Sequence, residues 1–310
     1  MSGASDTLRY ITSVLIECAR CGKAVSPTDD CCSACGFDPV NDPGRFGPYE
    51  LLERRGRGGL SVVFKARMNG TVSALKILES TRPKRVDQFA REIRVLSSLS
   101  HPNIVQVHDS GEVDGHRYMA MEFVEGLPLD AAIRQRMLDA PAAATVTAKA
   151  ARALQHLHDH GYVHRDVTPG NILLGPDHDP KISDFGLALS IEEVRRLAPG
   201  VTGGTPVYMS PEQASANHVA VDGRSDVYGL GAVLHEAIAG RPPFSGGDTL
   251  EILRRVREDP FVMPEGVDPD LGSILRQALE KDPDGRFDSM SDFAHALEAW
   301  AWRHRGRNGS

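Results

Sequence analysis

Short apolar or alternating segments dominate the chain between residues 49 and 123. They lie at residues 49–53, 61–67, 72–78, 104–108 and 118–123, and their length and alternation predict β-strands. Residues 85–99 break this series, because Phe89, Ile93 and Leu96 recur at the spacing of one buried helix face. Beyond Pro128 the pattern is mostly helical. This order predicts an α+β, two-lobed domain, in which a small β-rich lobe precedes a larger helical one.

Changes in composition divide the chain further. Pro and Gly are concentrated between Asn41 and Pro48, which predicts a linker or a sharp turn. We therefore expect an N-terminal tail at 1–15, a Cys-rich unit at 16–38, a linker at 39–48, one large domain at 49–302 and a C-terminal tail at 303–310.

The overall charge limits the kinds of partner that the chain is expected to bind. The 310 residues carry a formal net charge of −7, and an acidic chain repels nucleic acid and anionic lipid, so we expect no general binding to either. No stretch reaches the roughly 18 apolar residues of a membrane helix. Residues 10–16 are apolar but lack the basic region and the cleavage site of a signal peptide. These observations favour a cytoplasmic protein.

All the cysteines lie in the unit at 16–38. Cys18 with Cys21, and Cys32 with Cys35, form two Cys-x-x-Cys pairs, each followed by glycine. Such spacing lets four thiolates surround one tetrahedral ion, so the unit resembles a zinc ribbon with structural Zn²⁺. Cys31 could replace Cys32 as a ligand. The alternative is a reduced, disordered Cys-rich tail or a redox pair, and a docking or regulatory role for the unit is a hypothesis.

A glycine-rich segment joins two of the predicted strands. Gly56 and Gly58 lie in the run Gly-Arg-Gly-Gly-Leu-Ser, where glycines let backbone N–H groups approach a polyphosphate. A plain hairpin turn is the alternative interpretation. Lys76 on the strand that follows, and Glu92 on the predicted helix, could each be an ordinary solvated charge when taken alone.

Two later motifs change this interpretation. The run from His164 to Asn171 reads His-Arg-Asp-Val-Thr-Pro-Gly-Asn, and Asp184 opens Asp-Phe-Gly. Carboxylate and amide oxygens in such turns suit Mg²⁺, which prefers oxygen ligands. His164 has no soft donor beside it, and we interpret it as a packed structural histidine.

The ordered set of motifs resembles the signature of protein kinases of the eukaryotic type, and most closely the bacterial Ser/Thr kinases. The resemblance covers about residues 49–302 and implies the two-lobed protein kinase fold. It also implies that Lys76 binds the α- and β-phosphates of ATP and pairs with Glu92. Asp166 would accept the proton of the substrate hydroxyl, while Asn171 and Asp184 would bind Mg²⁺ or Mn²⁺.

The remaining implied roles concern the nucleotide and the supporting structure. The nucleotide contacts would be Gly56, Gly58 and Ser61 around the phosphates, Val63, Ala74 and Leu173 around the adenine, Met121 behind it, and Glu122 and Val124 at the hinge. Asp226 would brace the catalytic loop, Arg286 would pair with Glu212, and Thr205 would touch the catalytic loop.

Two positions depart from the kinase pattern. Ser61 replaces the third glycine, which a small residue tolerates. Thr168 replaces a lysine that normally neutralises charge on the transferring phosphate, and losing such a contact weakens transition-state binding by about 2–4 kcal/mol. A pseudokinase scaffold is therefore the second hypothesis, and a zinc-dependent adaptor is the third.

The resemblance also implies regulation through the activation loop. Arg165 would bind a phosphorylated loop, with Thr202 or Ser190 as the autophosphorylated residue. We expect protein substrates, and dimerisation would allow autophosphorylation in trans.

Overall fold

The computed structural model describes residues 16–18, 22–25, 34, 44–57, 61–198, 200 and 203–304, apart from the side chains of residues 16 and 57. The chain forms two compact units. The first comprises Met1–Ser98 and Val105–Val124, and the second comprises Leu99–Ile104 and Glu125–Ser310.

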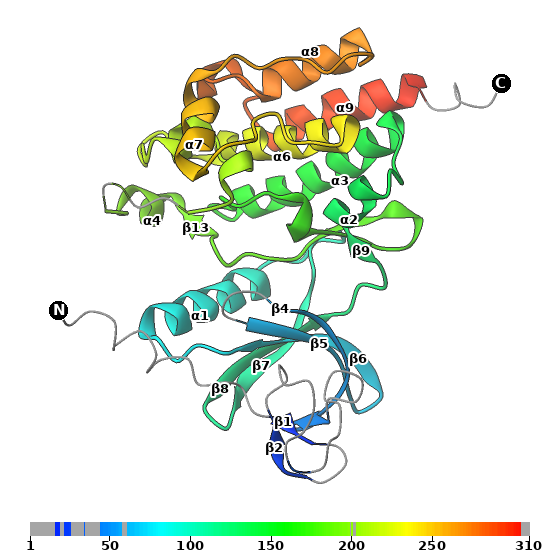
Figure 1. The fold of residues 1–310 in the computed structure, drawn as a ribbon, viewed down its shortest axis with the longest axis vertical. Helices are drawn as coiled ribbons and strands as arrows, with labels where there is room; N and C mark the ends of the chain where they lie inside the picture. Colours follow the sequence, from blue (N-terminus) through cyan, green and yellow to red (C-terminus); the bar gives the residue numbers. More distant parts are fainter. Residues whose placement is uncertain are drawn as a thin grey trace. The chain divides into compact units, whose positions relative to one another are not determined.

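The first unit is built on one antiparallel sheet and a helix. In the described residues the strand order is β2-β1-β3-β4-β5-β6-β8-β7 (Figure 1). The elements are β1 (Ile16–Glu17), β2 (Ala24–Val25), β3 (Arg45–Phe46), β4 (Tyr49–Arg57), β5 (Ser61–Met68), β6 (Thr71–Leu78), α1 (Pro83–Ser97), β7 (Val107–Val113) and β8 (His116–Glu122).

The central strands of this sheet have two distinct faces. Phe64, Leu75 and Ala120 are paired across β5, β6 and β8 and are almost completely buried. The alternate set Val63, Lys76 and Met119 is also in register. Successive side chains of a strand point to opposite faces, so the two sets occupy opposite sides of the sheet.

The second unit is mainly helical, with short strands. Its helices are α2 (Leu129–Arg134), α3 (Ala140–Asp159), α4 (Ile191–Arg195), α5 (Pro211–Ala214), α6 (Gly223–Ala239), α7 (Thr249–Glu258), α8 (Pro269–Ala278) and α9 (Met290–His304), with 3₁₀ turns at Pro169–Asn171, Pro176–His178, Pro206–Tyr208 and Pro283–Gly285. Its strands are β9 (Leu127–Pro128), β10 (Tyr162–Val163), β11 (Ile172–Leu174), β12 (Pro180–Ile182) and β13 (Leu189–Ser190).

Local sequence signals fix the ends of the main helices in this unit. The Asp139 side chain accepts a hydrogen bond from the N–H of Ala142 and caps α3, as expected for aspartate at a helix start. Asp222 caps α6, which ends at Gly240 with φ of 73°, a conformation that glycine adopts without strain. Helix α3 packs against both α6 and α9, and this packing forms the core of the unit.

Most of the predicted elements are confirmed, with one clear error. The expected strand at 104–108 is wrong, because β7 begins only at Val107. Ile104 instead forms an isolated bridge with Ile182 in the second unit. Ile104 and Val105 are buried, so their apolar character reflects burial of a connecting segment and not a strand.

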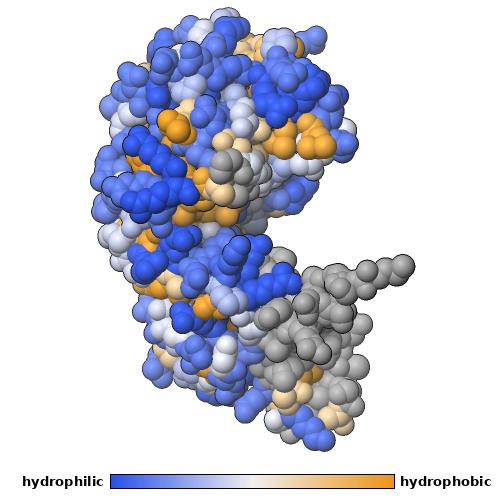
Figure 2. All heavy atoms as spheres, turned by 90° about the vertical axis from the view of Figure 1, so that its left-hand side faces the viewer, coloured by the Kyte–Doolittle hydropathy of each residue, from blue (hydrophilic) through white to orange (hydrophobic). Residues whose placement is uncertain are grey.

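The surface is largely polar on the face drawn in Figure 2, where apolar side chains form separate patches. Among the described residues, no helix is both long enough and apolar enough to cross a membrane.

Candidate active site

The first unit contributes a buried ion pair. Lys76 Nζ on β6 lies 2.7 Å from Glu92 Oε1 on α1, and the two side chains are only 12% and 4% exposed. Buried charges are stable only when they are paired, so the solvated interpretation of either residue is excluded. The predicted pairing of Lys76 with Glu92 is confirmed.

The residues expected around the adenine in this unit share the face of Lys76. Val63 lies opposite Lys76, and Ala74 lies opposite Met121. Because cross-strand partners project to the same side, the sheet presents apolar side chains beside the lysine. The amide of Glu122 at the end of β8 donates to the carbonyl of Gln106.

The other expected nucleotide contacts are distributed more widely. Gly56 lies on β4 and Ser61 begins β5, whereas Gly58 lies outside the described residues. Val124 ends the first unit, and Leu173 lies on β11 of the second.

The second unit contributes the loop that carries Asp166. Asp226 on α6 accepts hydrogen bonds of 2.8 Å from the amides of His164 and Arg165, and His158 contacts the same carboxylate. Burial works to raise the pKa of Asp226, but the hydrogen bonds from His158 and the His164 amide outweigh it and hold the pKa below its ordinary value. The expected bracing role of Asp226 is confirmed.

The loop backbone is strained where this bracing acts. Arg165 has φ of 69°, a conformation that residues other than glycine rarely adopt and that persists only when the surroundings enforce it. The side-chain amide of Gln213 donates to the Arg165 carbonyl at 2.9 Å. His164 is buried and packs edge-on against Phe185, which confirms its structural interpretation.

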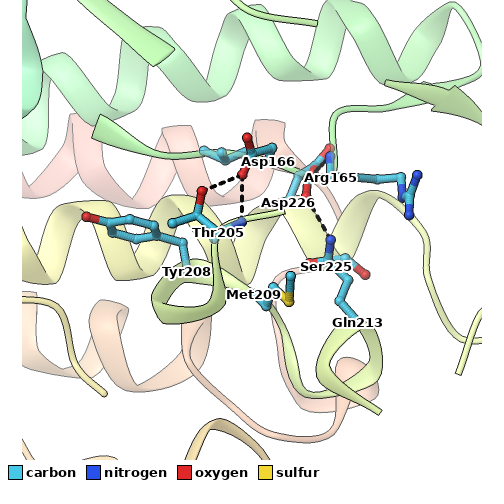
Figure 3. Close-up of a pocket in the computed structure, with 10 residues that line it drawn as sticks. Arg165, Asp166, Thr205, Tyr208, Met209, Gln213, Ser225 and Asp226 are labelled. Atoms are coloured by element: carbon cyan, nitrogen blue, oxygen red, sulfur yellow. Dashed lines mark hydrogen bonds between the residues drawn. The ribbon is translucent and has the colours of Figure 1, made fainter. Parts of the chain in front are cut away.

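Asp166 is oriented from two sides. Its Oδ1 accepts hydrogen bonds of 2.9 Å from both the amide and the hydroxyl of Thr205 (Figure 3), as expected for a contact with the catalytic loop. The amide nitrogen of Asn171 donates to the Asp166 carbonyl. Asp166 is therefore held at a fixed position by hydrogen bonds to its side chain and to its carbonyl.

Asn171 and Asp184 are brought together by paired strands. The amide of Ser183, the residue before Asp184, donates to the carbonyl of Asn171 at 3.0 Å. The Asn171 side-chain nitrogen is engaged by Asp166, so its oxygen is oriented away from that bond. This oxygen and the Asp184 carboxylate suit a hard cation such as Mg²⁺.

The segment that follows Asp-Phe-Gly contains both predicted phosphorylation sites. Ser190 caps α4, where its hydroxyl accepts from the Glu193 amide and its own amide donates to the Glu193 carboxylate. Thr202 lies outside the described residues. A side chain placed on Gly203 would lie 3.7 Å from Arg165 Nη2, so the guanidinium is next to this segment.

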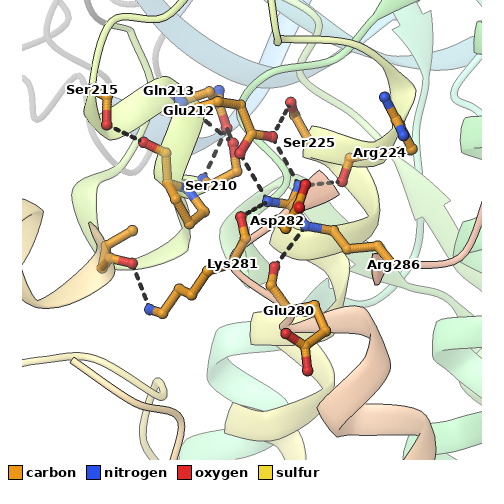
Figure 4. Close-up of polar contacts among 12 residues, drawn as sticks. Ser210, Glu212, Gln213, Ser215, Arg224, Ser225, Glu280, Lys281, Asp282 and Arg286 are labelled. Carbon is orange, nitrogen blue, oxygen red and sulfur yellow. Dashed lines mark hydrogen bonds and ion pairs between the residues drawn. The ribbon is translucent and has the colours of Figure 1, made fainter. Parts of the chain in front are cut away.

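A second buried ion pair supports the segment after Thr205. Arg286 forms two hydrogen bonds of 2.8 Å to Glu212, and Ser225 donates to the same carboxylate (Figure 4). The predicted pairing of Arg286 with Glu212 is confirmed.

Two residues that support the catalytic loop, His158 and Gln213, were not predicted from the sequence. Neither their residue type nor their spacing marks them.

Of the four predicted zinc ligands, only Cys18 is among the described residues, where it is buried. Cys21, Cys32 and Cys35 lie outside them. The part of the chain that the structure describes contains no cluster of three or more metal-binding side chains.

Together, a lobe with a buried Lys–Glu pair and a lobe with a braced aspartate, an asparagine and Asp-Phe-Gly define a protein kinase domain. The chain belongs to the protein kinase domain family, whose model matches residues 49–298.

Curated relatives of known class align over most of the chain. The DNA damage-responsive serine/threonine-protein kinase RqkA of Deinococcus radiodurans is 39% identical over 84% of this chain and 40% of its own length. Serine/threonine-protein kinases PknA and PknB of Mycobacterium tuberculosis are both 36% identical, over 82% and 79% of this chain and 61% and 41% of their own lengths. The chain thus spans less than two thirds of the length of each of these relatives.

Proposed function

We propose that this protein transfers the γ-phosphate of ATP to Ser or Thr hydroxyls of proteins, including its own activation segment. The observation that carries the proposal is the fixed orientation of Asp166 by Thr205 and Asn171. The family membership and the serine/threonine kinase names of its relatives support the proposal.

In the proposed reaction Asp166 receives the proton of the attacking hydroxyl. The hydroxyl oxygen forms a bond to the γ-phosphorus as the bond from that phosphorus to the bridging oxygen breaks, which leaves ADP. Lys76, held by Glu92, binds the α- and β-phosphates. Phosphoryl transfer depends on positioning and on stabilising negative charge, and both effects are provided by side chains that neighbouring residues hold in place.

Asn171 and Asp184 would hold Mg²⁺ or Mn²⁺ through oxygen atoms. When bound, the cation supplies charge neutralisation at the phosphates. The hydrogen bond from Asn171 to Asp166 links this cation site to the residue that accepts the proton.

Thr168 is the residue of the proposed site that should limit the rate of phosphoryl transfer. It is a buried residue of the loop that carries Asp166, and a hydroxyl cannot neutralise phosphate charge as an ammonium does. We therefore propose an active enzyme whose chemical step is slower than it would be with lysine.

Autophosphorylation is proposed at Thr202, in trans between two copies. Gly203 next to it lies beside the Arg165 guanidinium, which could pair with a phosphate. Ser190 is less suitable, because its hydroxyl caps α4 and a phosphate there would face the Glu193 carboxylate. We place the reaction in the cytoplasm, where ATP is available.

Structural zinc bound by Cys18, Cys21, Cys32 and Cys35 is proposed for the unit at 16–38. The spacing supports it, as does the turn after Cys18, where the Gly22 amide donates to the Cys18 carbonyl and Gly22 has φ of 70°. About one zinc per chain is expected by elemental analysis, with loss in Cys32→Ser and retention in Cys31→Ser. Full zinc content in Cys32→Ser would contradict the assignment.

The catalytic proposal is tested with Mg²⁺ and γ-labelled ATP. Label should enter the wild type and not Asp166→Asn. If neither protein is labelled while both still bind ATP, the chain is a nucleotide-binding scaffold and the proposal fails.

A further inference from the structure

A small cavity lies beside the catalytic loop in the second unit (Figure 3). It offers about 10 Å³ to the centre of a water-sized sphere, which is the space that one water molecule needs. Three segments form its wall: residues 165–167 of the catalytic loop, the turn from Thr205 to Met209 together with Gln213, and α6. The cavity therefore lies between the loop that carries Asp166 and the segments that support this loop.

The wall of the cavity is mostly buried and carries polar groups. Ser225 and Asp226 are each 1% exposed, and Val167 is 5% exposed. An apolar cavity of this size stays dry, whereas a polar one holds water when two or more hydrogen-bonding groups face it. The chemistry of the wall therefore decides whether water enters.

Gly229 in the middle of α6 shows which groups face the cavity. A Cβ atom at this position would lie 3.4 Å from the Tyr208 carbonyl oxygen and 3.5 Å from the Val167 carbonyl oxygen. Two carbonyl oxygens from separate segments therefore converge on one point in the wall. Glycine is less favourable than alanine inside a helix, and here it leaves that point free of a side chain.

We propose that the cavity is a binding site for one water molecule, which donates a hydrogen bond to each of these two carbonyl oxygens. Buried carbonyl groups need hydrogen-bond donors, and a water molecule has two hydrogens. A water that bridges two protein groups is nearly as favourable as a direct hydrogen bond between them.

The bound water couples the catalytic loop to the turn that orients Asp166. Val167 follows Asp166 directly, and Tyr208 ends the 3₁₀ turn that begins after Thr205. The amide and the hydroxyl of Thr205 in turn bind the Asp166 carboxylate. This inference rests on the proposed function only in naming Asp166 as the residue whose position the water stabilises.

Two substitutions of Gly229 provide a matched test. Gly229→Ala fills the cavity with a methyl group that cannot donate a hydrogen bond, whereas Gly229→Ser brings a hydroxyl that can. A crystal structure of the wild type that shows ordered water should contain one water within hydrogen-bond distance of both carbonyl oxygens. The same site in Gly229→Ala should hold none.

Hydrogen exchange measures the coupling in solution. The amides of Arg165 and Tyr208 lie on the two sides of the cavity and are hydrogen-bonded to Asp226 and to the Thr205 carbonyl. In Gly229→Ala both amides should exchange about fivefold faster, as for the loss of one hydrogen bond. Gly229→Ser should keep the exchange rates of the wild type.

Gly231→Ala is the control for adding a methyl group to α6. Its Cβ would lie 2.9 Å from the Cβ of Ala278, so it should lower the Tm without selectively speeding exchange at Arg165 and Tyr208. A wild-type crystal structure without water in the cavity, or equal exchange in Gly229→Ala and Gly229→Ser, would overturn the proposal. Neither readout requires phosphoryl transfer, so a wild type that holds the water but transfers no phosphate would contradict the proposed function alone.

Discussion

Removing Arg286 should be among the most destabilising single changes in the second unit. The Arg286 side chain is 0% exposed and Glu212 is 4% exposed. The guanidinium donates two hydrogen bonds to Glu212 and others to the carbonyls of Arg224, Glu280 and Lys281. In Arg286→Met the Glu212 carboxylate stays buried without its cationic partner, although Ser225 still donates to it at 2.6 Å.

The size of the effect follows from the burial. Breaking a fully buried ion pair from one side destabilises a protein by about 3–5 kcal/mol, because one charge is left uncompensated. That is a large part of the roughly 5–15 kcal/mol that stabilises a typical domain. Urea unfolding followed by circular dichroism should therefore show a much lower midpoint for Arg286→Met.

A double variant separates the lost pair from the lost packing. Glu212→Leu with Arg286→Met removes both charges, so its unfolding free energy should exceed that of Arg286→Met alone. Arg286→Lys keeps the positive charge but lacks the planar guanidinium, so its unfolding free energy should lie between those of the wild type and Arg286→Met. A loss below about 1 kcal/mol in Arg286→Met, the size typical of an exposed pair, would refute the reasoning.

Other predictions concern pH and the active site. Burial lowers the pKa of His235 to about 4, so the unfolded chain binds a proton before the folded one does as pH falls. The free energy of unfolding should therefore be highest above pH 6.5 and should fall by about 3 kcal/mol as the pH decreases towards 4. In His235→Asn, the unfolding free energy measured against pH should fall less steeply over this range. Glu92→Gln removes the charge that holds Lys76, so kcat/KM for ATP should fall about 10- to 100-fold, as for loss of a charged hydrogen bond. An unchanged kcat/KM would contradict the role of Glu92 in holding Lys76. Thr205→Val loses the hydroxyl bond to Asp166 and should lower kcat about tenfold, while Thr205→Ser should retain it in the same steady-state assay. Thr168→Lys restores a cation and should raise kcat at least tenfold, and a lower kcat would show that the site is built around threonine.

The motifs predicted that Asp166, Asn171 and the segment before Asp184 would lie together, and hydrogen bonds join them in the structure. The spacing from Asp166 to Asn171 and Asp184 depends on tight turns between short strands, and such local geometry is encoded in neighbouring residues. The pairing of Lys76 with Glu92 was predictable only from the resemblance, because each residue taken alone has the pattern of a solvated charge.

Other features depend on contacts between distant segments. Nothing at residues 16–46 indicates that Cys18 and Val25 would share a core with Phe64 and Leu75, since this segment was separated from the sheet by an expected linker. His158 and Gln213 support the catalytic loop from elsewhere in the fold. The error at 104–108 has the same origin, because Ile104 is buried and its backbone forms an isolated bridge with the distant Ile182, outside any named strand.

The central claim, phosphoryl transfer to Ser or Thr through Asp166, is tested most directly by identifying the phosphorylated residue. Purified protein is incubated with Mg²⁺ and γ-labelled ATP, and the labelled amino acids are separated after hydrolysis. We predict phosphoserine or phosphothreonine from the wild type and no label from Asp166→Asn. Label in phosphotyrosine alone, or equal labelling of Asp166→Asn, would contradict the account.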